Sequence, residues 1–344
     1  MNSKLKDIYR KLDQEGLDAL LVISAANISY LAGFPAQDAY LLISVKKNIY
    51  FTDSRYLNSA AKNLLGCGLK EINTDAFDRI INTCAKLGLK KVGFEKDYLT
   101  FTRYQELRGG PGIELTPVCG FVEELRQVKD AEELRKIRIA ADLARKALKY
   151  IKDIIVPGKR EIEVAGELER ILRYAGASKS SFDIIVASGP NSSFPHYITG
   201  KRKIRDNEPV LVDVGADYLG YKSDLTRVFI SGKIDTLYRK IQEIVFKARD
   251  LAIQQIRPGK KAQDIDSASR SYIAKKGFGK YFVHSLGHGL GLEVHEGPRL
   301  SPKNGNVLKA GMVLTVEPAI YIPGKFGSRV EDMVIVTRNG CEVL

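Results

Sequence analysis

The stretch VLVDVGADYLGYKSDLTRVF, residues 210–229, contains two runs rich in β-branched residues on either side of a short turn. This pattern is typical of an antiparallel hairpin. We place the centre of the turn between Tyr218 and Leu219. Asp213 then lies directly opposite Asp224. Because like charges that face each other on neighbouring strands are destabilising, the pattern predicts a hairpin whose two carboxylates need a cation between them.

A second hairpin follows the same scheme in VLTVEPAIYIPGKFGSRVEDMVIV, residues 313–336. A turn centred on Gly324 places Glu317 opposite Glu331. For either pair alone, an error in register or a solvated edge strand is the simpler explanation. The two pairs together, in a region that also contains most of the histidines, favour a metal site. Carboxylates with an imidazole suit Mn, Co, Fe or Zn, and four carboxylates are enough to hold two ions.

Histidine is concentrated in HSLGHGLGLEVHE, residues 284–296. This stretch contains three of the four histidines, His284, His288 and His295, and the fourth, His196, lies in NSSFPHYITG. The glycines between them disfavour a helix, since each costs about 1 kcal/mol relative to alanine. We expect a loop that runs into a strand over 291–296, with glycines that let the backbone approach a neighbour closely. Histidine is also a natural general acid or base near neutral pH.

The chain changes character near residue 122, where we place a domain boundary. Residues 1–122 predict a small α/β domain with strands over 17–24, 39–53 and 90–95 and helices over 54–66 and 75–88. A helical period covers 121–155. Beyond residue 180 the chain is mostly strand-like, with helices expected over 235–256 and 262–276. The second domain, residues 123–344, is therefore predicted to be α+β with antiparallel hairpins.

The composition excludes several classes of protein. The net charge is +13, but no zinc finger or long basic block accompanies it, and the nearest candidate is GKRKIR, residues 200–205. A solvated lysine-rich surface is the preferred interpretation, and a nucleic-acid partner is not expected. No apolar run reaches the roughly 18 residues of a membrane span, and the start does not resemble a signal peptide. Four cysteines without a CxxC pair favour a reduced, cytoplasmic protein.

Four motifs together resemble the pita-bread metallopeptidases. They are LVDVGADYLGYKSDLTR (211–227), HSLGHGLGLEVHE (284–296), TVEPAIY (315–321) and SRVEDM (328–333). The first half also resembles the extra N-terminal domain of the proline-specific branch, in LDALLVISAANISYLAGF (17–34) and FTDSRY (51–56). Methionine aminopeptidases generally lack that domain. The resemblance therefore favours Xaa-Pro aminopeptidases and Xaa-Pro dipeptidases, also called prolidases.

The resemblance implies a dinuclear metal site, with Mn or Co expected and Zn or Fe as alternatives. The implied ligands are Asp213 on one metal, His288 and Glu317 on the second, and Asp224 and Glu331 bridging both. His196 would lie near the scissile nitrogen, His295 would face the carbonyl oxygen, and His284 would hold the residue after the cleaved bond. Glu317 would also accept a proton, and Arg329 would contact a substrate carboxylate or carbonyl. The resemblance also implies a homodimer.

We expect a peptidase that acts on small peptides with proline in second position. An Xaa-Pro aminopeptidase is the first interpretation, and a dipeptidase or a non-catalytic pita-bread binding protein are the alternatives. Metal-free, creatinase-like hydrolysis is disfavoured because all five ligand positions are present. The chain departs from the family at Tyr197, which stands where the family has Gly beside the catalytic histidine, and at Ala319, which replaces a Gly after Glu-Pro.

Overall fold

The computed structural model describes residues 3–64, 66–73, 76–108 and 112–344. The chain separates into two compact units, Met1–Arg126 and Gln127–Leu344. The division falls after Arg126, whereas we expected it near residue 122. Each unit has its own apolar core and is described by itself.

The first unit is built on a six-stranded mixed sheet with strand order β4-β3-β2-β1-β5-β6. Its strands are β1 (Ala19–Val22), β2 (Ala39–Ser44), β3 (Ile49–Thr52), β4 (Gly68–Glu71), β5 (Lys91–Glu95) and β6 (Glu114–Val118). β1 pairs antiparallel with β2 and parallel with β5. The strands expected over 17–24, 39–53 and 90–95 are confirmed, the second of them as the β2–β3 hairpin.

Helices accompany this sheet, as expected for an α/β unit. They are α1 (Ser3–Gln14), α2 (Ala25–Ala32), α3 (Ser54–Asn63), α4 (Ala76–Leu87), α5 (Phe101–Arg108) and α6 (Glu123–Arg126). The side chain of Asp53 caps α3 by accepting a hydrogen bond from the Arg55 amide. The helices expected over 54–66 and 75–88 are confirmed as α3 and α4, although residues 65 and 75 lie outside the described residues.

The second unit begins with two long helices, α7 (Ala131–Ile151) and α8 (Glu161–Ala175). The continuous helix predicted over 121–155 is wrong, because helical structure stops between Arg126 and Ala131. A capping box starts a new helix at this point. The Asp130 carboxylate accepts from the Glu133 amide at 2.9 Å, and the Glu133 carboxylate accepts from the Asp130 amide at 3.0 Å. These bonds satisfy amide groups that an α-helix leaves free at its start.

Antiparallel strands make up the rest of the second unit, together with α9 (Thr236–Ile253) and α10 (Ala262–Lys275). The strands are β7 (Lys179–Ser180), β8 (Ile185–Ser188), β9 (Glu208–Val214), β10 (Ala216–Tyr218), β11 (Tyr221–Lys222), β12 (Leu225–Ser231), β13 (Gly287–Gly289), β14 (Glu296–Leu300), β15 (Val313–Val316), β16 (Ala319–Ile322), β17 (Phe326–Arg329), β18 (Asp332–Val336) and β19 (Cys341–Val343). They form sheets β11-β10-β7, β12-β9-β8, β14-β13-β15-β18-β19 and β16-β17. The α+β class, the antiparallel hairpins and the helices expected over 235–256 and 262–276 are confirmed.

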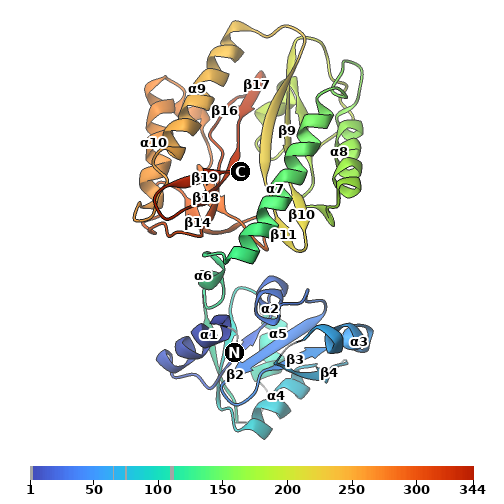
Figure 1. Cartoon of the computed structure of the whole chain (residues 1–344), viewed down its shortest axis with the longest axis vertical. Coiled ribbons are helices and arrows are strands. Elements are labelled where there is room, and N and C mark those ends of the chain that lie inside the picture. Colours follow the sequence, from blue (N-terminus) through green and yellow to red (C-terminus); the bar gives the residue numbers. More distant parts are fainter. Residues whose placement is uncertain (1–2, 65, 74–75, 109–111) are drawn as a thin grey trace. The chain divides into compact units, whose positions relative to one another are not determined.

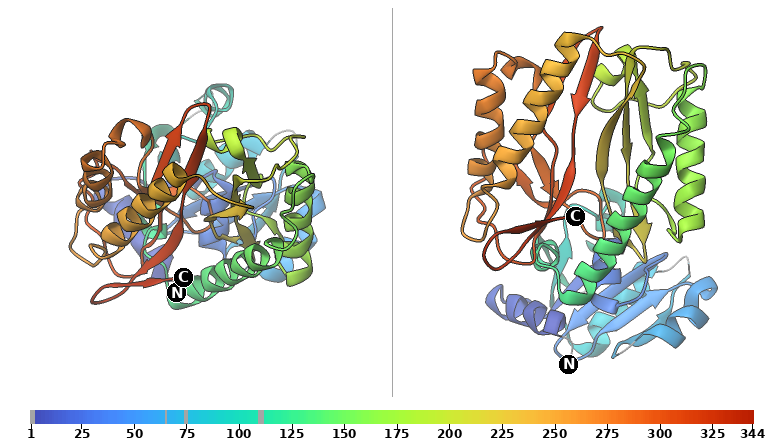
Figure 2. Two further views of the ribbon diagram at one scale, coloured as in Figure 1. Left: turned by 90° about the horizontal axis from the view of Figure 1, so that it is seen from above. Right: turned by 45° about the horizontal axis from the view of Figure 1, so that its top comes forward.

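Two helix pairs enclose these strands. α7 packs against α8 on one side, and α9 packs against α10 on the other (Figures 1 and 2). The first pair contributes to an apolar cluster that includes Ile137, Leu168 and Val212, and the second to one that includes Tyr238 and Leu314. The strands that carry the predicted site residues are therefore held between two apolar cores.

The register of the first hairpin differs from the prediction. Tyr218 pairs with Tyr221, and Asp213 pairs with Thr226 rather than with Asp224. The direct Asp213–Asp224 pair is therefore wrong. The reason is the turn, which uses Leu219 and Gly220 at φ values of 50° and 88°, as a two-residue type I′ turn requires. Because side chains alternate with a period of two, a shift by two residues keeps both carboxylates on one face.

The register of the second hairpin is confirmed. Ala319 pairs with Arg329 in the β16–β17 ladder, and Val316 pairs with Asp332 in the β15–β18 ladder. Both ladders have the register that a turn centred on Gly324 predicts. Glu317 and Glu331 lie between the two ladders, where the strands are interrupted.

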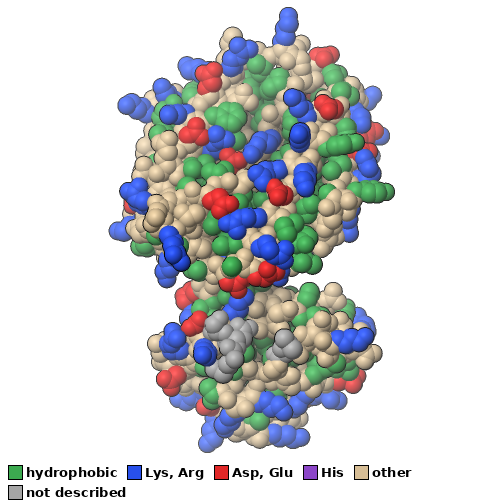
Figure 3. Space-filling view, viewed as in Figure 1, with side chains coloured by type: hydrophobic (Ala, Val, Ile, Leu, Met, Phe, Trp, Pro, Cys, Tyr) green, Lys and Arg blue, Asp and Glu red, His purple; other side chains and the backbone are tan. Residues whose placement is uncertain are grey.

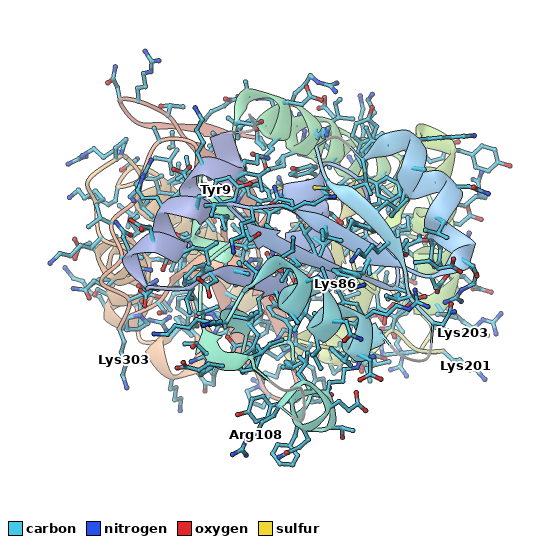
Figure 4. All side chains as sticks on the ribbon, turned by 90° about the horizontal axis from the view of Figure 1, so that it is seen from below. Tyr9, Lys86, Arg108, Lys201, Lys203 and Lys303 are labelled. Carbon is cyan, nitrogen blue, oxygen red and sulfur yellow. The ribbon has the colours of Figure 1, made fainter. Side chains whose placement is uncertain are left out.

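Charged residues on the surface are mixed in sign. On the face shown in Figure 3, Lys and Arg side chains are interspersed with Asp and Glu. Within GKRKIR, Lys201 and Lys203 are exposed and project at the rim of the view in Figure 4. Arg202, by contrast, donates to the Glu208 carboxylate at 2.6 and 2.7 Å.

Among the described residues, no helix is long and apolar enough to cross a membrane.

A buried ion pair gives a test of this fold. Lys129 Nζ donates to Glu296 Oε2 at 3.1 Å, and the two side chains are 1% and 6% exposed. Replacing Lys129 by Met leaves a buried carboxylate without this partner, so the free energy of unfolding should fall by about 3–5 kcal/mol. Urea unfolding followed by circular dichroism measures it. The control Lys146→Met changes an exposed lysine of α7, and a loss no greater than in this control would contradict the prediction.

Candidate active site

A cavity of about 1440 Å³ opens in the second unit. Its lining includes all nine of the site residues expected from the sequence, which are His196, Asp213, Asp224, His284, His288, His295, Glu317, Arg329 and Glu331. They come from segments that lie far apart in the chain. The fold therefore brings the expected residues together in one place.

Three of the four carboxylates stand where strands are interrupted. Asp224 lies between β11 and β12, Glu317 between β15 and β16, and Glu331 between β17 and β18. At these positions the backbone bonds to other segments. The Glu317 amide donates to Leu286 O at 2.8 Å, and the Glu331 amide donates to Thr226 O at 3.2 Å. These bonds join the two hairpins to each other and to the histidine stretch.

The glycines around His288 are required by a close approach of backbones. A Cβ atom on Gly287 would lie 2.0 Å from Thr315 O, and one on Gly289 would lie 2.1 Å from Gly297 O. The expected close approach is therefore confirmed, because no larger residue fits at either position. The strand expected over 291–296 is wrong for 291–295, which form bends, and β14 begins at Glu296.

Asp224, His288 and Glu331 form the centre of the site. Each offers a ligand atom, these atoms lie within 4.8 Å of one another, and all three residues are buried. His288 Nε2 lies 3.8 Å from Asp224 Oδ2 and 3.4 Å from Glu317 Oε1. The arrangement thus gathers carboxylate oxygens around one imidazole nitrogen.

Asp213 accepts a hydrogen bond from the buried side chain of Arg329. The guanidinium donates to Asp213 Oδ2, to the Tyr321 hydroxyl at 2.6 Å, and to Thr226 Oγ1 and Pro195 O at 3.1 Å each. Arg329 is only 4% exposed. The group that we expected to contact substrate is therefore bonded to four oxygens of the protein.

The histidines differ in their surroundings. His284 Nδ1 lies 2.7 Å from Ser285 O and its Nε2 lies 3.1 Å from the Tyr321 hydroxyl. The rings of His288 and His295 meet edge to face, with centroids 4.4 Å apart. His196 is exposed. The histidines therefore surround the carboxylates from several sides.

Burial raises the pKa of the carboxyl groups. It is the largest cause of the raised pKa values of Asp224 and Glu331, and the neighbouring carboxylates raise both further. Burial also raises the pKa of Glu317 to about 8, against the opposing effect of Arg329. Without a cation, Glu317 therefore holds a proton near neutral pH, and the same effect favours the protonated form of Asp224 and Glu331.

Burial acts in the opposite direction on the histidines. It lowers the pKa of His284 and that of His288 to about 4 each, and it also lowers the pKa of His295. These imidazoles are therefore uncharged near neutral pH. An uncharged imidazole can bind a metal ion or accept a proton.

The residues fit a divalent cation. The Oδ1 atoms of Asp213 and Asp224 are buried and have no hydrogen-bond partner among the described residues. An unpaired buried acceptor is costly, and binding of a cation at each of these atoms would offset that cost. The donor set of carboxylate oxygens and imidazole nitrogen suits Mn, Co, Fe or Zn.

Three further residues of the site were missed in the sequence. Thr226 donates to Glu331 Oε2 at 2.7 Å, and the Tyr321 hydroxyl joins Arg329 to His284. Arg299 lines the cavity from β14 and is exposed. The correct hairpin register would have revealed Thr226 opposite Asp213. No local pattern marks Arg299.

Metal binding should release protons. Because the pKa of Glu317 is raised to about 8, a cation must displace its proton at pH 6 to 8, so the affinity for Mn²⁺ should rise with pH by about tenfold per unit for each proton released. Calorimetric titration of metal-free protein at pH 6, 7 and 8 measures this. Glu317→Gln should weaken binding and flatten the dependence, whereas Glu169→Gln, at another carboxylate of the cavity lining, should not. An affinity independent of pH would contradict the prediction.

Comparisons with known proteins agree with this geometry. Residues 135–338 match the family model of metallopeptidase family M24, and residues 4–128 match that of the creatinase/prolidase N-terminal domain. The Xaa-Pro dipeptidase of Pyrococcus horikoshii is 36% identical, over 100% of this chain and 97% of its own length.

Solved structures agree as well. That of an Xaa-Pro dipeptidase from Bacillus anthracis has a TM-score of 0.96 at 39% identity and covers 99% of this chain and 96% of its own. That of an X-Pro aminopeptidase from Thermotoga maritima has a TM-score of 0.92 at 32% identity, with coverages of 98% and 96%. The chain therefore belongs to metallopeptidase family M24, as a hydrolase with a creatinase/prolidase N-terminal domain followed by a catalytic domain of the pita-bread fold.

Proposed function

We propose that the protein is an Xaa-Pro dipeptidase that hydrolyses the bond between a first residue and a C-terminal proline. The observation that carries the proposal is the cavity in which buried carboxylates, histidines and the exposed Arg299 lie together. Relatives named as Xaa-Pro dipeptidases, at 36% and 39% identity, support it.

Membership of the M24 family implies divalent metal ions. We propose that two such ions, Mn or Co, are held by Asp213, Asp224, His288, Glu317 and Glu331. When bound, they would supply Lewis acidity at the scissile carbonyl and lower the pKa of water. Zn and Fe are the alternatives that the same donor set accepts.

The chain's own residues would bind the dipeptide and move its protons. Glu317, whose Oε1 lies 3.4 Å from His288 Nε2, would accept a proton at its carboxylate during the reaction. His295 would donate a hydrogen bond to the carbonyl oxygen of the first residue. His196 would stand near the proline nitrogen, which must gain a proton as the bond breaks. His284 would contact the proline side of the substrate.

Arg299 gives the dipeptidase interpretation its physical basis. A dipeptide ends in a free carboxylate directly after proline, and an arginine binds a carboxylate with two parallel hydrogen bonds. Arg299 is exposed and lines the same cavity as His288 and His295. Arg329, in contrast, already donates to four protein oxygens.

An Xaa-Pro aminopeptidase, our first interpretation of the sequence, is the second candidate. The cavity of about 1440 Å³ exceeds the ~300–1,000 Å³ typical of small-molecule pockets. A cavity of this size has room for a peptide that continues beyond proline. The similarity to an X-Pro aminopeptidase structure also favours this candidate.

We also propose a reducing, cytoplasmic location and a homodimer. All four cysteines, Cys67, Cys84, Cys119 and Cys341, carry free thiols. Free thiols are typical of proteins in reducing compartments. The homodimer rests on the habit of the family, and light scattering on the purified chain tests it.

Substrate length separates the two candidates. Mn- or Co-loaded protein should release the first residue from Met-Pro at least about tenfold faster, in kcat/KM, than from Met-Pro-Ala, and Met-Ala should resist cleavage. Glu317→Gln should lower kcat by about a hundredfold or more. Equal rates for the tripeptide would favour the aminopeptidase. No cleavage of any proline peptide by the metal-loaded protein would refute both.

The role of Arg299 has a separate test. Arg299→Ala should raise KM for Met-Pro by about tenfold or more, because a hydrogen bond to a charged group contributes about 1.5–3 kcal/mol. KM for the C-terminal amide of Met-Pro should stay the same, because the amide has no carboxylate. Arg205→Ala, at an exposed arginine outside the cavity lining, is the matched control. An equal rise for both substrates would count against carboxylate recognition.

A further inference from the structure

The segment that carries His196 has no regular secondary structure. Residues 194–200 follow the 3₁₀ helix Gly189–Ser193 as turn and coil. His196 is exposed, and no hydrogen bond joins its imidazole to another of the described residues. Its place in the cavity must therefore be set by the residues beside it.

Neighbouring residues of this segment are anchored at separate points. Pro195 O accepts from Arg329 Nη1 at 3.1 Å. Thr199 Oγ1 donates to Ile184 O at 2.9 Å. Between them, the Tyr197 hydroxyl donates to Glu161 Oε2 at 2.8 Å. Tyr197 is adjacent to His196 in the chain, so this hydrogen bond fixes the backbone directly beside the imidazole.

Glu161 is a rigid anchor for that bond. It is the first residue of α8 and is fully buried. Its Oε1 accepts from the Ser188 amide and hydroxyl at 2.7 Å each and from Asn191 Nδ2 at 3.0 Å. Asn191 Nδ2 also lies 2.7 Å from the Tyr197 hydroxyl. A side chain held by this many groups keeps one position.

The surroundings of Tyr197 keep its hydroxyl protonated and leave space for it. Burial, followed by the hydrogen bond to Glu161, raises the pKa of Tyr197 to about 12, so the hydroxyl keeps the proton that it donates. Gly200 leaves space for it, because a Cβ atom there would lie 3.0 Å from the hydroxyl oxygen. Glycine, which the family resemblance implies at position 197, could not make this bond.

We propose that Tyr197 is a positioning residue whose hydroxyl ties the His196 segment to the buried carboxylate of Glu161 and so fixes where His196 stands in the cavity. The proposal rests on the proposed function in giving His196 a part in the reaction. The hydrogen bond and its effect on the imidazole are independent of that function, so they can be measured separately.

The histidine content makes the direct test simple. The chain has four histidines, so full-length protein labelled with ¹³C-histidine should show four imidazole Cε1–H signals, and His196→Gln assigns one of them. In Tyr197→Phe the His196 signal should shift or broaden while the other three stay in place. Tyr174→Phe, which alters an 84% exposed tyrosine on α8, should change none. An unmoved His196 signal in Tyr197→Phe overturns the proposal.

Kinetics provide the second measurement. With metal-loaded protein and Met-Pro, Tyr197→Phe should lower kcat by about tenfold and leave KM within about twofold, because a displaced catalytic group slows the reaction more than it weakens binding. An unchanged kcat in an active enzyme overturns the proposal. If wild-type protein cleaves no proline peptide, the proposed function fails, and the imidazole spectrum alone decides whether the tether exists.

Gly200→Ala is a second variant that tests the proposal independently, in case Tyr197→Phe does not fold. It keeps every hydrogen-bonding group but adds a methyl 3.0 Å from the Tyr197 hydroxyl. We expect the His196 signal to move and kcat to fall in the same direction as in Tyr197→Phe, by a smaller factor. A His196 signal that is unchanged in Gly200→Ala would overturn the proposal even if Tyr197→Phe did not fold.

Discussion

Four carboxyl groups share one cavity with His288, and their repulsion is the constraint on which the site depends. Burial and the neighbouring acids raise the pKa of Asp224, Glu317 and Glu331. Arg329 compensates Asp213 directly, but a buried carboxylate cluster stays costly until protons or cations neutralise it. The two helix-covered apolar cores on either side of the strands supply the stability that lets such a cluster persist.

The strands that carry the carboxylates are interrupted at the site. Asp224, Glu317 and Glu331 each lie in a gap between two strands. Their segments are then free to bond across the sheets, as the Glu331 amide does to Thr226 O. The backbones near His288 approach so closely that only glycine fits at Gly287. Regular ladders on both sides of the gaps hold the carboxylates to a fixed geometry, which a metal site requires.

The groups around the carboxylate cluster are held by a second set of hydrogen bonds. Arg329 reaches both Asp213 and Pro195 O, and so connects a predicted metal ligand with the segment that carries His196. Glu161, at the start of α8, reaches the same segment through Tyr197. The first helix pair and the second hairpin therefore both act on His196. Through Arg329 and Tyr197, the segment that carries His196 and the proposed metal ligand Asp213 belong to one hydrogen-bonded network.

The residue types and their spacing along the chain determined much of this protein. All nine expected residues line the cavity, and the turn at Gly324 gave the right register, because local chemistry sets a hairpin. The predicted register of the first hairpin was wrong because its turn places Leu219 at a positive φ, a conformation that residues with a side chain rarely adopt. Only the tertiary structure joined Tyr197 to Glu161 and showed Arg329 bonded to protein oxygens. Such contacts link residues far apart in sequence, and packing rather than local spacing decides them.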